Sequence, residues 1–108
     1  MDQSAGIPTD VFAAISAPAR RAILGRLAER EMPVLELAET FAMTLSAVSQ
    51  HLSVLRGAGL VSTRKQGRQR IYRLNAEPLR EVEEWVSTYE QFWTDKLAAL
   101  GGYLEENR

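Results

Sequence analysis

Four short hydrogen-bonding side chains recur on one side of the segment between Thr44 and Gly59. Serine hydroxyls both donate and accept hydrogen bonds, and a glutamine amide can bind the edge of adenine with two of them. The side chains are short enough for close approach, and the segment has no carboxylate that would repel a phosphate. This chemistry suits the reading of DNA base edges in the major groove. The four residues, which we name the reading face, are Ser46, Ser49, Gln50 and Ser53.

A helix surface that merely faces solvent is the competing interpretation of these residues. Serine is a middling helix former because its hydroxyl competes for nearby backbone groups, so a surface selected only for solubility would more often carry Glu, Lys or Gln. We predict that Ser46, Ser49 and Gln50 contact bases. Ser53 and Thr44 are expected to lie nearer the DNA backbone.

Two other side chains of this segment carry a ring or a charge. Arg56 is expected at a phosphate. His51 has two interpretations: it contacts a phosphate or a base, or it serves packing, which is the commoner role of a lone histidine in a helix. We include His51 among the DNA-binding candidates and leave the choice open.

The charges of the chain are segregated along the sequence. The net charge is only −1, yet the segment 40–76 holds six of the 13 Lys and Arg residues and none of the 14 Asp and Glu residues. Such segregation lets a nearly neutral protein present a cationic face to a polyanion. Chance clustering on a solvated surface is the alternative, and it leaves the missing acids unexplained.

The elements that would position these residues follow from the apolar spacing. Val48, Leu52 and Leu55 form a stripe of helical period behind the reading face. Thr44 is suited to cap the start of that helix, and Gly59 to take the left-handed position after its end. The same periodicity and two proline boundaries predict three helices upstream. The four expected helices cover residues 9–16, 18–30, 34–41 and 45–57.

The order of elements predicts the fold. Two helices joined as tightly as the last pair make a helix-turn-helix, whose second helix can enter the major groove. Residues 60–74 form a β-hairpin with Gly67 at its tip, and residues 78–106 form a final helix. The expected fold is mainly α with a small β-hairpin. It is a winged helix-turn-helix of about five helices and a two-stranded wing, in a single DNA-binding domain of residues 1–108.

The expected wing carries bases on its arms and its tip and no acid. Arg68 and Arg70, at and just past the tip, are expected to contact phosphate or the minor groove. Phosphate contacts position a protein on DNA without carrying sequence information, so the wing would grip DNA rather than read it. The wing candidates are Arg64, Lys65, Arg68 and Arg70.

The final helix has an apolar face that one small domain cannot cover. A helix of this length spans about 45 Å, whereas a domain of about 100 residues has a radius of gyration near 13 Å. We therefore expect a homodimer through the first and last helices. A cofactor box is the alternative, but aromatic residues at helical spacing usually form a core or an interface. The predicted dimer-interface residues are Val11, Phe12, Ile15, Val82, Val86, Tyr89, Trp93, Leu97 and Leu100.

Composition excludes several classes of function. The chain has no cysteine and one histidine, so it can build neither a thiolate site nor a multi-histidine metal site. Carboxylates of the last helix offer only oxygen ligands, which suit zinc, copper and nickel poorly, and we interpret them as a solvated face. No paired acid and base, nucleophile elbow or phosphate-binding glycine loop is evident. We expect no catalysis, no metal and no cofactor.

The sequence also predicts where the protein resides. The stretch MDQSAGIPTD lacks the basic start and apolar core of a signal peptide. No apolar run approaches the roughly 18 residues of a membrane span. These features predict a cytoplasmic protein.

Three motifs give the chain a family resemblance. They are PARRAIL (18–24), AVSQHLSVLRGAGLV (47–61) and GRQRIYRL (67–74). In this order and at these separations the chain resembles the ArsR/SmtB family of bacterial transcriptional repressors, over about Val11 to Leu104. The resemblance implies a homodimer in which the helix beginning near Thr44 reads an operator and the hairpin grips the flanking backbone. The family often has Asp where Ala17 stands, which affects a helix cap of about 1 kcal/mol.

The resemblance also bears on sensing. Metal-sensing members place cysteines on the third helix or His and Asp/Glu sets on the last, whereas here the third helix reads VLELAETF and the last has no histidine. Some relatives with a similar aromatic last helix, which here contains Phe92-Trp93, have no known metal and repress their own promoters. The implied type is the one that binds no metal.

We therefore expect a dimeric, sequence-specific DNA-binding regulator that represses its own or a neighbouring promoter. Its expected partners are double-stranded operator DNA and a second copy of the chain. A small-molecule effector near the aromatic interface stays open, because nothing in the sequence identifies one. The alternative is a winged-helix module that docks to protein, which would need exposed apolar anchors where this chain has serines and arginines.

Overall fold

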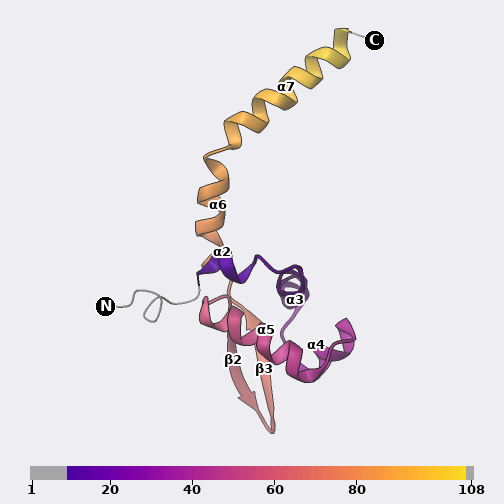
Figure 1. Ribbon diagram of the computed structural model, residues 1–108, viewed down its shortest axis with the longest axis vertical. Coiled ribbons are helices and arrows are strands. Elements are labelled where there is room, and N and C mark those ends of the chain that lie inside the picture. The colour runs from indigo at the N-terminus through magenta and orange to yellow at the C-terminus, as the bar shows by residue number, and fades with distance from the viewer. Residues whose placement is uncertain (1–9, 107–108) are drawn as a thin grey trace, which may run out of the picture.

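The computed structural model describes the backbone of residues 10–106 and the side chains of residues 10–102. Over this range it contains six helices and a three-stranded antiparallel sheet (Figure 1). The helices are α2 (Val11–Ala14), α3 (Pro18–Glu29), α4 (Val34–Phe41), α5 (Leu45–Gly57), α6 (Leu79–Ser87) and α7 (Glu90–Glu106). The strands are β1 (Met32–Pro33), β2 (Val61–Gln66) and β3 (Gln69–Leu74).

The core lies where α3, α4 and α5 meet the sheet. Each helix contributes apolar residues three or four positions apart, which lie on one face of the helix. Burying one such aliphatic side chain contributes roughly 1.5–3 kcal/mol, so packing rather than helix propensity holds α5 in place. The buried residues are Val11, Ala14, Ile23, Leu24, Leu27, Met32, Leu37, Val48, Leu52, Leu55, Leu60, Val61 and Ile71.

Helix α5 begins and ends as its sequence predicts. The Thr44 hydroxyl accepts a hydrogen bond from the Ala47 amide at 3.1 Å, which caps the first turn. At the other end Gly59 has φ +77°, and the amides of Gly59 and Leu60 donate to the carbonyls of Arg56 and Leu55 at 3.0 and 2.9 Å. These paired bonds form a Schellman motif, which satisfies the last carbonyls of the helix and turns the chain into β2.

The turn between α4 and α5 is strained at one residue. Ala42 has φ +51° and is the one non-glycine residue with positive φ between residues 10 and 106. An alanine in this region costs roughly 1–2 kcal/mol. The Met43 amide donates to the Ala38 carbonyl at 3.1 Å and helps hold the turn closed. The buried faces of α4 and α5 fix the angle between the two helices against this strain.

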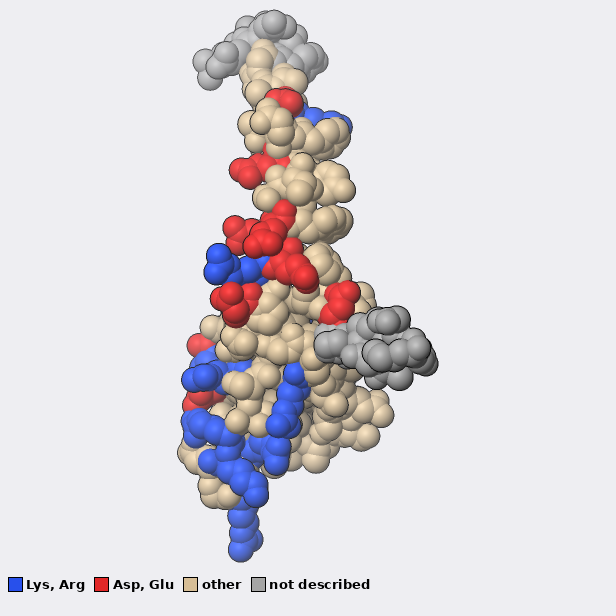
Figure 2. Space-filling view, turned by 90° about the vertical axis from the view of Figure 1, so that its left-hand side faces the viewer, with Lys and Arg blue, Asp and Glu red and all other residues tan. Residues whose placement is uncertain are grey.

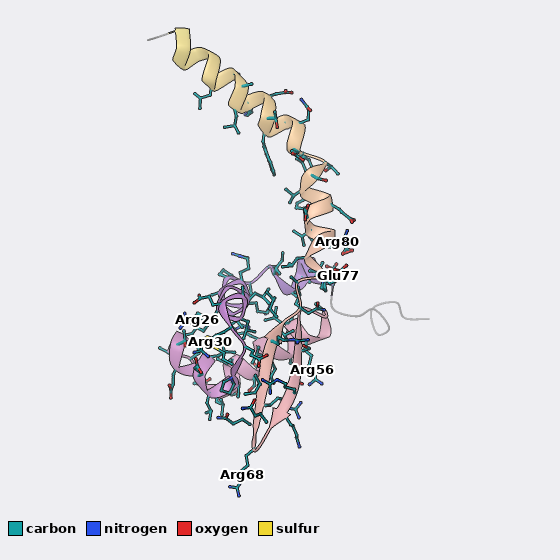
Figure 3. All side chains as sticks on the ribbon, turned by 180° about the vertical axis from the view of Figure 1, so that it is seen from behind. Arg26, Arg30, Arg56, Arg68, Glu77 and Arg80 are labelled. Carbon is teal, nitrogen blue, oxygen red and sulfur yellow. The ribbon has the colours of Figure 1, made fainter. Side chains whose placement is uncertain are left out.

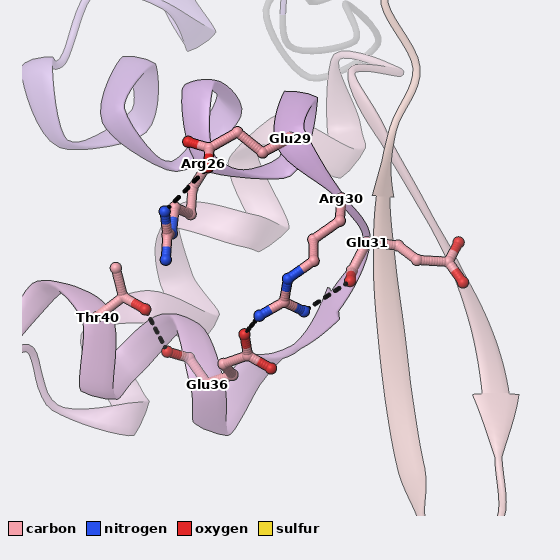
Figure 4. Close-up of polar contacts among 6 residues, drawn as sticks. All are labelled: Arg26, Glu29, Arg30, Glu31, Glu36 and Thr40. Atoms are coloured by element: carbon pink, nitrogen blue, oxygen red, sulfur yellow. Dashed lines mark hydrogen bonds and ion pairs between the residues drawn. The ribbon is translucent and has the colours of Figure 1, made fainter.

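Polar contacts fasten the connection between α3 and α4 (Figure 4). Arg30, just after α3, pairs with Glu36 of α4 and donates to the Glu31 carbonyl at 3.4 Å. Within α4 itself, the Thr40 hydroxyl donates to the Glu36 carbonyl at 2.8 Å. Exposed ion pairs contribute about 0–1 kcal/mol each, so these contacts orient the connection more than they stabilise the fold.

The hairpin turns where the sequence predicts, through Gly67 and Arg68. Gly67 has φ +63°, and Arg68 does not share the positive φ. Glycine at the first central position of a two-residue loop is the pattern of a type II′ turn, whose twist matches that of the strands. Lys65 pairs with Arg70 and Gln66 with Gln69 across the strands, so the two-residue loop sets the register.

A third strand joins the sheet, and the expected two-stranded wing was incomplete in this respect. Met32 pairs with Tyr72 and Pro33 with Ile71, giving the strand order β1-β3-β2. A two-residue strand is too short to show an alternating pattern, and proline is accepted here because β1 is an edge strand. The consequence is that the segment after α3 lies beside the wing.

The single helix expected over 78–106 is wrong, because the chain breaks into α6 and α7 at Thr88 and Tyr89. The Ser87 hydroxyl donates to the Glu84 carbonyl at 2.7 Å, and the Thr88 hydroxyl to the Trp85 carbonyl at 2.8 Å. Such side-chain bonds compete with the backbone bonds of a helix. Two adjacent hydroxyl residues therefore favour a break that apolar periodicity does not reveal.

The first helix is also shorter than expected. It covers Val11–Ala14 instead of 9–16, and Asp10 caps it by accepting from the Phe12 amide at 2.6 Å. Thr9, the expected start, lies outside the described residues. The side chain of Leu104, at the end of the family resemblance, is also outside them.

The described part of the chain is elongated. Its radius of gyration is 18.9 Å and its extents are 63 × 42 × 21 Å. Figure 1 shows β2 and β3, which we name the wing, at one end of the long axis. Helices α6 and α7, which we name the arm, project from the other end. No helix within residues 10–106 is long and apolar enough to cross a membrane.

Candidate nucleic-acid interface

The reading face lies on the outer side of α5. Ser46, Ser49, Gln50 and Ser53 are all exposed, because the apolar stripe of the same helix is turned into the core. Leu45, at the first position of α5, is 45% exposed and was not predicted. A leucine beside serines and a glutamine suits the kind of apolar contact that thymine methyl groups receive. The signal that could have found Leu45 is its place one turn before Ser49.

Thr44 and Arg56 lie at opposite ends of the reading helix. Thr44 is exposed although its hydroxyl caps α5, and this leaves the hydroxyl hydrogen available to an outside acceptor. Arg56 is exposed in the last turn and lies beside the sheet (Figure 3). Since Arg56 stands nearer the wing than the first turn of α5 does, a contact to the DNA backbone suits it better than a contact to the first bases read.

His51 is half-buried and faces α3. Its Nδ1 lies 3.4 Å from Nη1 of Arg20, a residue that the sequence alone did not mark as functional. The two residues are 31 positions apart, so no local spacing could have revealed the contact. The ring therefore belongs to the edge of the reading helix rather than to the centre of the reading face.

The wing places its bases at the far end of the molecule. Arg68 points away from the tip of the hairpin in Figure 3, and Lys65, Arg68 and Arg70 are exposed. Lys65 lies directly opposite Arg70 in the antiparallel pairing. Like charges in this position destabilise a hairpin, and an anion bound between them would offset the repulsion. The wing thus carries a local cost that a phosphate group would relieve.

One wing arginine has an acidic neighbour that the sequence did not predict. Arg64 forms an ion pair with Glu31, and its Nη1 donates to Gln66 Oε1 at 2.6 Å. Glu31 immediately precedes β1, so the pairing of β1 with β3 brings this carboxylate to the acid-free segment. The wing itself carries no acid, but Glu31 from outside it competes with any phosphate at Arg64.

The charges divide the surface into two ends. Figure 2 shows Lys and Arg gathered at the wing end and Asp and Glu gathered at the base of the arm. The separation follows the sequence. The segment 40–76, which supplies the reading helix and the wing, has no acid, whereas the arm carries Glu81, Glu83, Glu84, Glu90 and Asp95. A polyanion is attracted to one end of the molecule and repelled by the other.

The arm carries six of the eight exposed large hydrophobic residues in the described part of the chain. The Trp85 ring packs edge-on against Phe12 of α2 at 5.6 Å and against Tyr89 at 5.7 Å. Leu97 is 68% exposed, and other large side chains of α7 are also exposed. Contiguous exposed apolar surface of this kind usually marks a contact site. The exposed large residues of the arm are Trp85, Tyr89, Phe92, Trp93, Leu97 and Leu100.

The assignment of Val11 to the dimer interface needs correction. Val11 is 5% exposed and packs in the domain core, so its side chain has little surface to offer a second chain. Phe12, Ile15 and Val82 are only partly buried against that core and keep exposed edges. Trp85 and Phe92, which the predicted set omitted, widen the exposed face.

An open groove of about 770 Å³ lies between the start of α2, the end of α5 and α6. Asp10, Glu77, Glu81 and Glu84 are among its lining residues, so its charge disfavours an anionic ligand. Among residues 10–102 no group of three or more His, Cys, Asp and Glu side chains is arranged to hold a metal ion. The groove therefore offers a phosphate no alternative to the wing.

Comparison with known proteins adds independent information. A family model described as a helix-turn-helix domain matches residues 15–64. The HTH-type transcriptional regulator Rv2034 of Mycobacterium tuberculosis is 38% identical, covering 91% of this chain and 86% of that protein. The transcriptional repressor SdpR of Bacillus subtilis is 34% identical, covering 74% of this chain and 89% of that protein.

Solved structures agree with the sequence relatives. The crystal structure of an ArsR family transcriptional regulator superimposes with a TM-score of 0.67 and 38% sequence identity. The match covers 77% of this chain and 91% of that one. An identity this high together with the shared fold indicates common ancestry as well as common architecture.

Proposed function

The chain belongs to the ArsR/SmtB family of winged helix-turn-helix transcriptional repressors, and from this premise we propose that it is a homodimer that binds a specific operator and represses transcription. Its general role as a DNA-binding transcriptional regulator follows from the relatives. The operator contacts, the dimer and the direction of regulation are the proposal.

One observation carries the assignment of the DNA contacts. The exposed side of α5 bears four short polar residues and no carboxylate, and the basic wing follows it directly in the chain. In the proposed complex Ser46, Ser49 and Gln50 read base edges in the major groove. Thr44 and Ser53 contact the DNA backbone beside them, and Arg56 binds a phosphate. His51 acts at the edge of the same helix.

The wing supplies affinity in this proposal. Lys65, Arg68 and Arg70 neutralise phosphates and release their counterions, which favours specific and random DNA alike. Arg64 joins them when the phosphate replaces Glu31 as its partner. Base reading by α5 and phosphate binding by the wing need different side chains. This is why the short polar side chains lie on α5 and the long cationic ones lie on the hairpin.

The proposed dimer uses the apolar surface of the arm. Helix α7 projects beyond the domain, and its aromatic and leucine side chains are exposed in one chain alone. A second copy related by a two-fold axis would cover this surface with the same residues. A two-fold dimer also presents two copies of α5 to half-sites about one DNA turn apart, roughly 34–36 Å. The residues involved are Phe12, Ile15, Val82, Val86, Tyr89, Trp93, Leu97 and Leu100.

Footprinting on the DNA upstream of the protein's own gene tests the proposal. We expect protection of two half-sites with centres about one helical turn apart, and loss of transcription from that promoter when the protein is added. Random DNA of equal length, at the same salt concentration, is the control. Binding that does not distinguish the two DNAs, or an increase in transcription, would defeat the proposal.

A further inference from the structure

A single guanidinium joins three helices beside the reading face. Arg20 Nε donates to the Ala14 carbonyl at 2.6 Å, and Nη2 donates to the Ala13 carbonyl at 3.3 Å. Both acceptors are at the end of α2, whereas Arg20 belongs to α3. The third contact, from Nη1 at 3.4 Å, reaches His51 Nδ1 on α5. Arg20 is half-buried, and two anchors on α2 leave the guanidinium little freedom to turn.

The contact between Arg20 and His51 can be made in only one way. A guanidinium has five N–H donors and no acceptor, and it stays protonated in proteins. His51 Nδ1 must therefore accept, so this nitrogen carries no proton. A neutral histidine then bears its proton on Nε2. A protonated ring would lose the acceptor and set a second cation against Arg20.

The position of His51 gives this tautomer a use. The two ring nitrogens point in diverging directions, so Nε2 points away from Arg20. His51 follows Gln50 directly and is only half-buried, which leaves part of the ring open to solvent at the edge of the reading face. An N–H group there can donate to a phosphate oxygen or to a purine N7, both of which accept hydrogen bonds.

We propose that Arg20 is a positioning residue for operator binding, which holds His51 in the tautomer and orientation that donate from Nε2 to the DNA. This inference rests on the proposed function. It also unites the two interpretations of His51, because the packing contact with α3 is what prepares the ring for the DNA contact.

The same guanidinium links the reading helix to α2, the helix that packs against the arm. Arg20 is anchored on the carbonyls that end α2, and Phe12 of α2 packs against Trp85 of α6. A shift of α2 would move the guanidinium and with it the partner of His51. Arg20 thus fixes the edge of the reading face relative to the dimerisation elements.

Nitrogen NMR of the wild-type protein tests the contact without DNA. The chain has one histidine, so its ring signals need no assignment by mutation. With the ring in its neutral form, we expect the proton on Nε2 and a bare Nδ1. Replacing Arg20 by Met removes the donor that faces Nδ1. The Nδ1 signal should then shift toward that of a ring nitrogen that carries the proton. A wild-type ring protonated at Nδ1, or a ring unaffected by Arg20→Met, would overturn the inference.

Operator binding tests the role, and Arg21→Met is the matched control. Arg21 is the next residue, its Nη1 donates to the Ile15 carbonyl at 2.7 Å, and it carries the same charge. We expect Arg20→Met to weaken operator binding about tenfold per half-site in the wild-type background, the worth of one hydrogen bond to a charged group. In the His51→Ala background Arg20→Met should cost no more than Arg21→Met does.

Two results separate this inference from the proposed function. Losses from Arg20→Met and His51→Ala that simply multiply would show that the residues act independently, and the inference would fail while operator binding stands. A wild-type protein that binds no operator would defeat the proposed function itself. Thermal melting of each variant checks that it is folded. If a variant is unfolded, the NMR result on the wild-type protein still tests the inference.

Discussion

The wing end and the arm end of this molecule both expose side chains suited to binding a partner, but the two ends suit partners of opposite chemistry. At the wing end the exposed side chains are short, polar or cationic, and at the arm they are aromatic or leucine with carboxylates between them. A closed apolar core lies between the two ends. In the proposed complex, DNA and a second protein chain therefore bind at different ends of one small domain. The carboxylates of the arm repel DNA, and the polarity of the reading face makes it a poor protein interface.

In the proposed homodimer the two ends depend on each other through the interface between the two arms, so the largest effect is expected when the arm loses its partner. Leu97→Glu would put a carboxylate on each side of a two-fold interface, removing roughly 1.5–3 kcal/mol of apolar burial per side chain and burying an unpaired charge. We expect monomers by sedimentation, and operator affinity lower by about a thousandfold or more, toward the non-specific level.

Leu35→Glu is the matched control for that change. Leu35 lies on α4 outside the arm and is 54% exposed, so the same substitution there should leave the sedimentation of the protein unchanged. A Leu97→Glu protein that stays dimeric would place the interface elsewhere.

At the wing end the largest single effect is expected on the reading face. Gln50→Ala removes an amide that can bind one base with two hydrogen bonds, so operator binding should weaken by roughly 1–3 kcal/mol per half-site. Binding to random DNA should hardly change. Titrations on both DNAs at one salt concentration measure the difference, and an equal loss on both would make Gln50 a backbone contact.

A smaller effect that is equal on all DNA should come from the wing tip. Arg68→Ala is expected to cost roughly 1 kcal/mol per half-site and to flatten the slope of log K against log salt by about 0.9 for each phosphate that the variant no longer neutralises. Arg80→Ala removes the same charge from the arm, where Arg80 pairs with Glu77, and should leave the slope unchanged. Equal slopes for the two variants would contradict the division of the molecule into two ends.

The smallest expected change strengthens binding. Glu31→Gln releases Arg64 from its ion pair, and the gain should stay below about 1 kcal/mol because exposed pairs are weak. We expect a modest rise in affinity for random DNA with a steeper salt slope, since Arg64 then neutralises a phosphate. The double variant Glu31→Gln with Arg64→Ala should abolish the gain, and a gain that persists would assign it to something other than Arg64.

Much of the architecture could be predicted because it is local. The period of Val48, Leu52 and Leu55, together with the residues at both ends, predicted the bounds of α5 at Leu45–Gly57. The proline at the start of α3 and the glycine at the hairpin tip act within a few residues of their own position. The family assignment, confirmed by the relatives, rests on the same local motifs.

The predictions that failed have a common cause, which is contact between distant or competing groups. Two-residue β1 exists only because β3 offers it hydrogen bonds. The break between α6 and α7 depends on hydroxyls that capture carbonyls, a competition that apolar spacing does not record. Val11 was assigned to the interface by its periodicity, but the fold buries it in the core.

The amino-acid order alone establishes most of the helices and the hairpin, which of their faces are polar, and that the segment 40–76 carries positive charge without acids, because these properties depend on neighbours within one or two turns. The closing of the core establishes which distant residues meet. It sets Arg20 against His51, Glu31 against Arg64 and Phe12 against Trp85. Each pair is more than 30 residues apart in sequence, so its formation depends on how the whole core closes. For that reason the fold and its charged end could be foreseen, whereas the contacts that tune the reading helix and the wing could not.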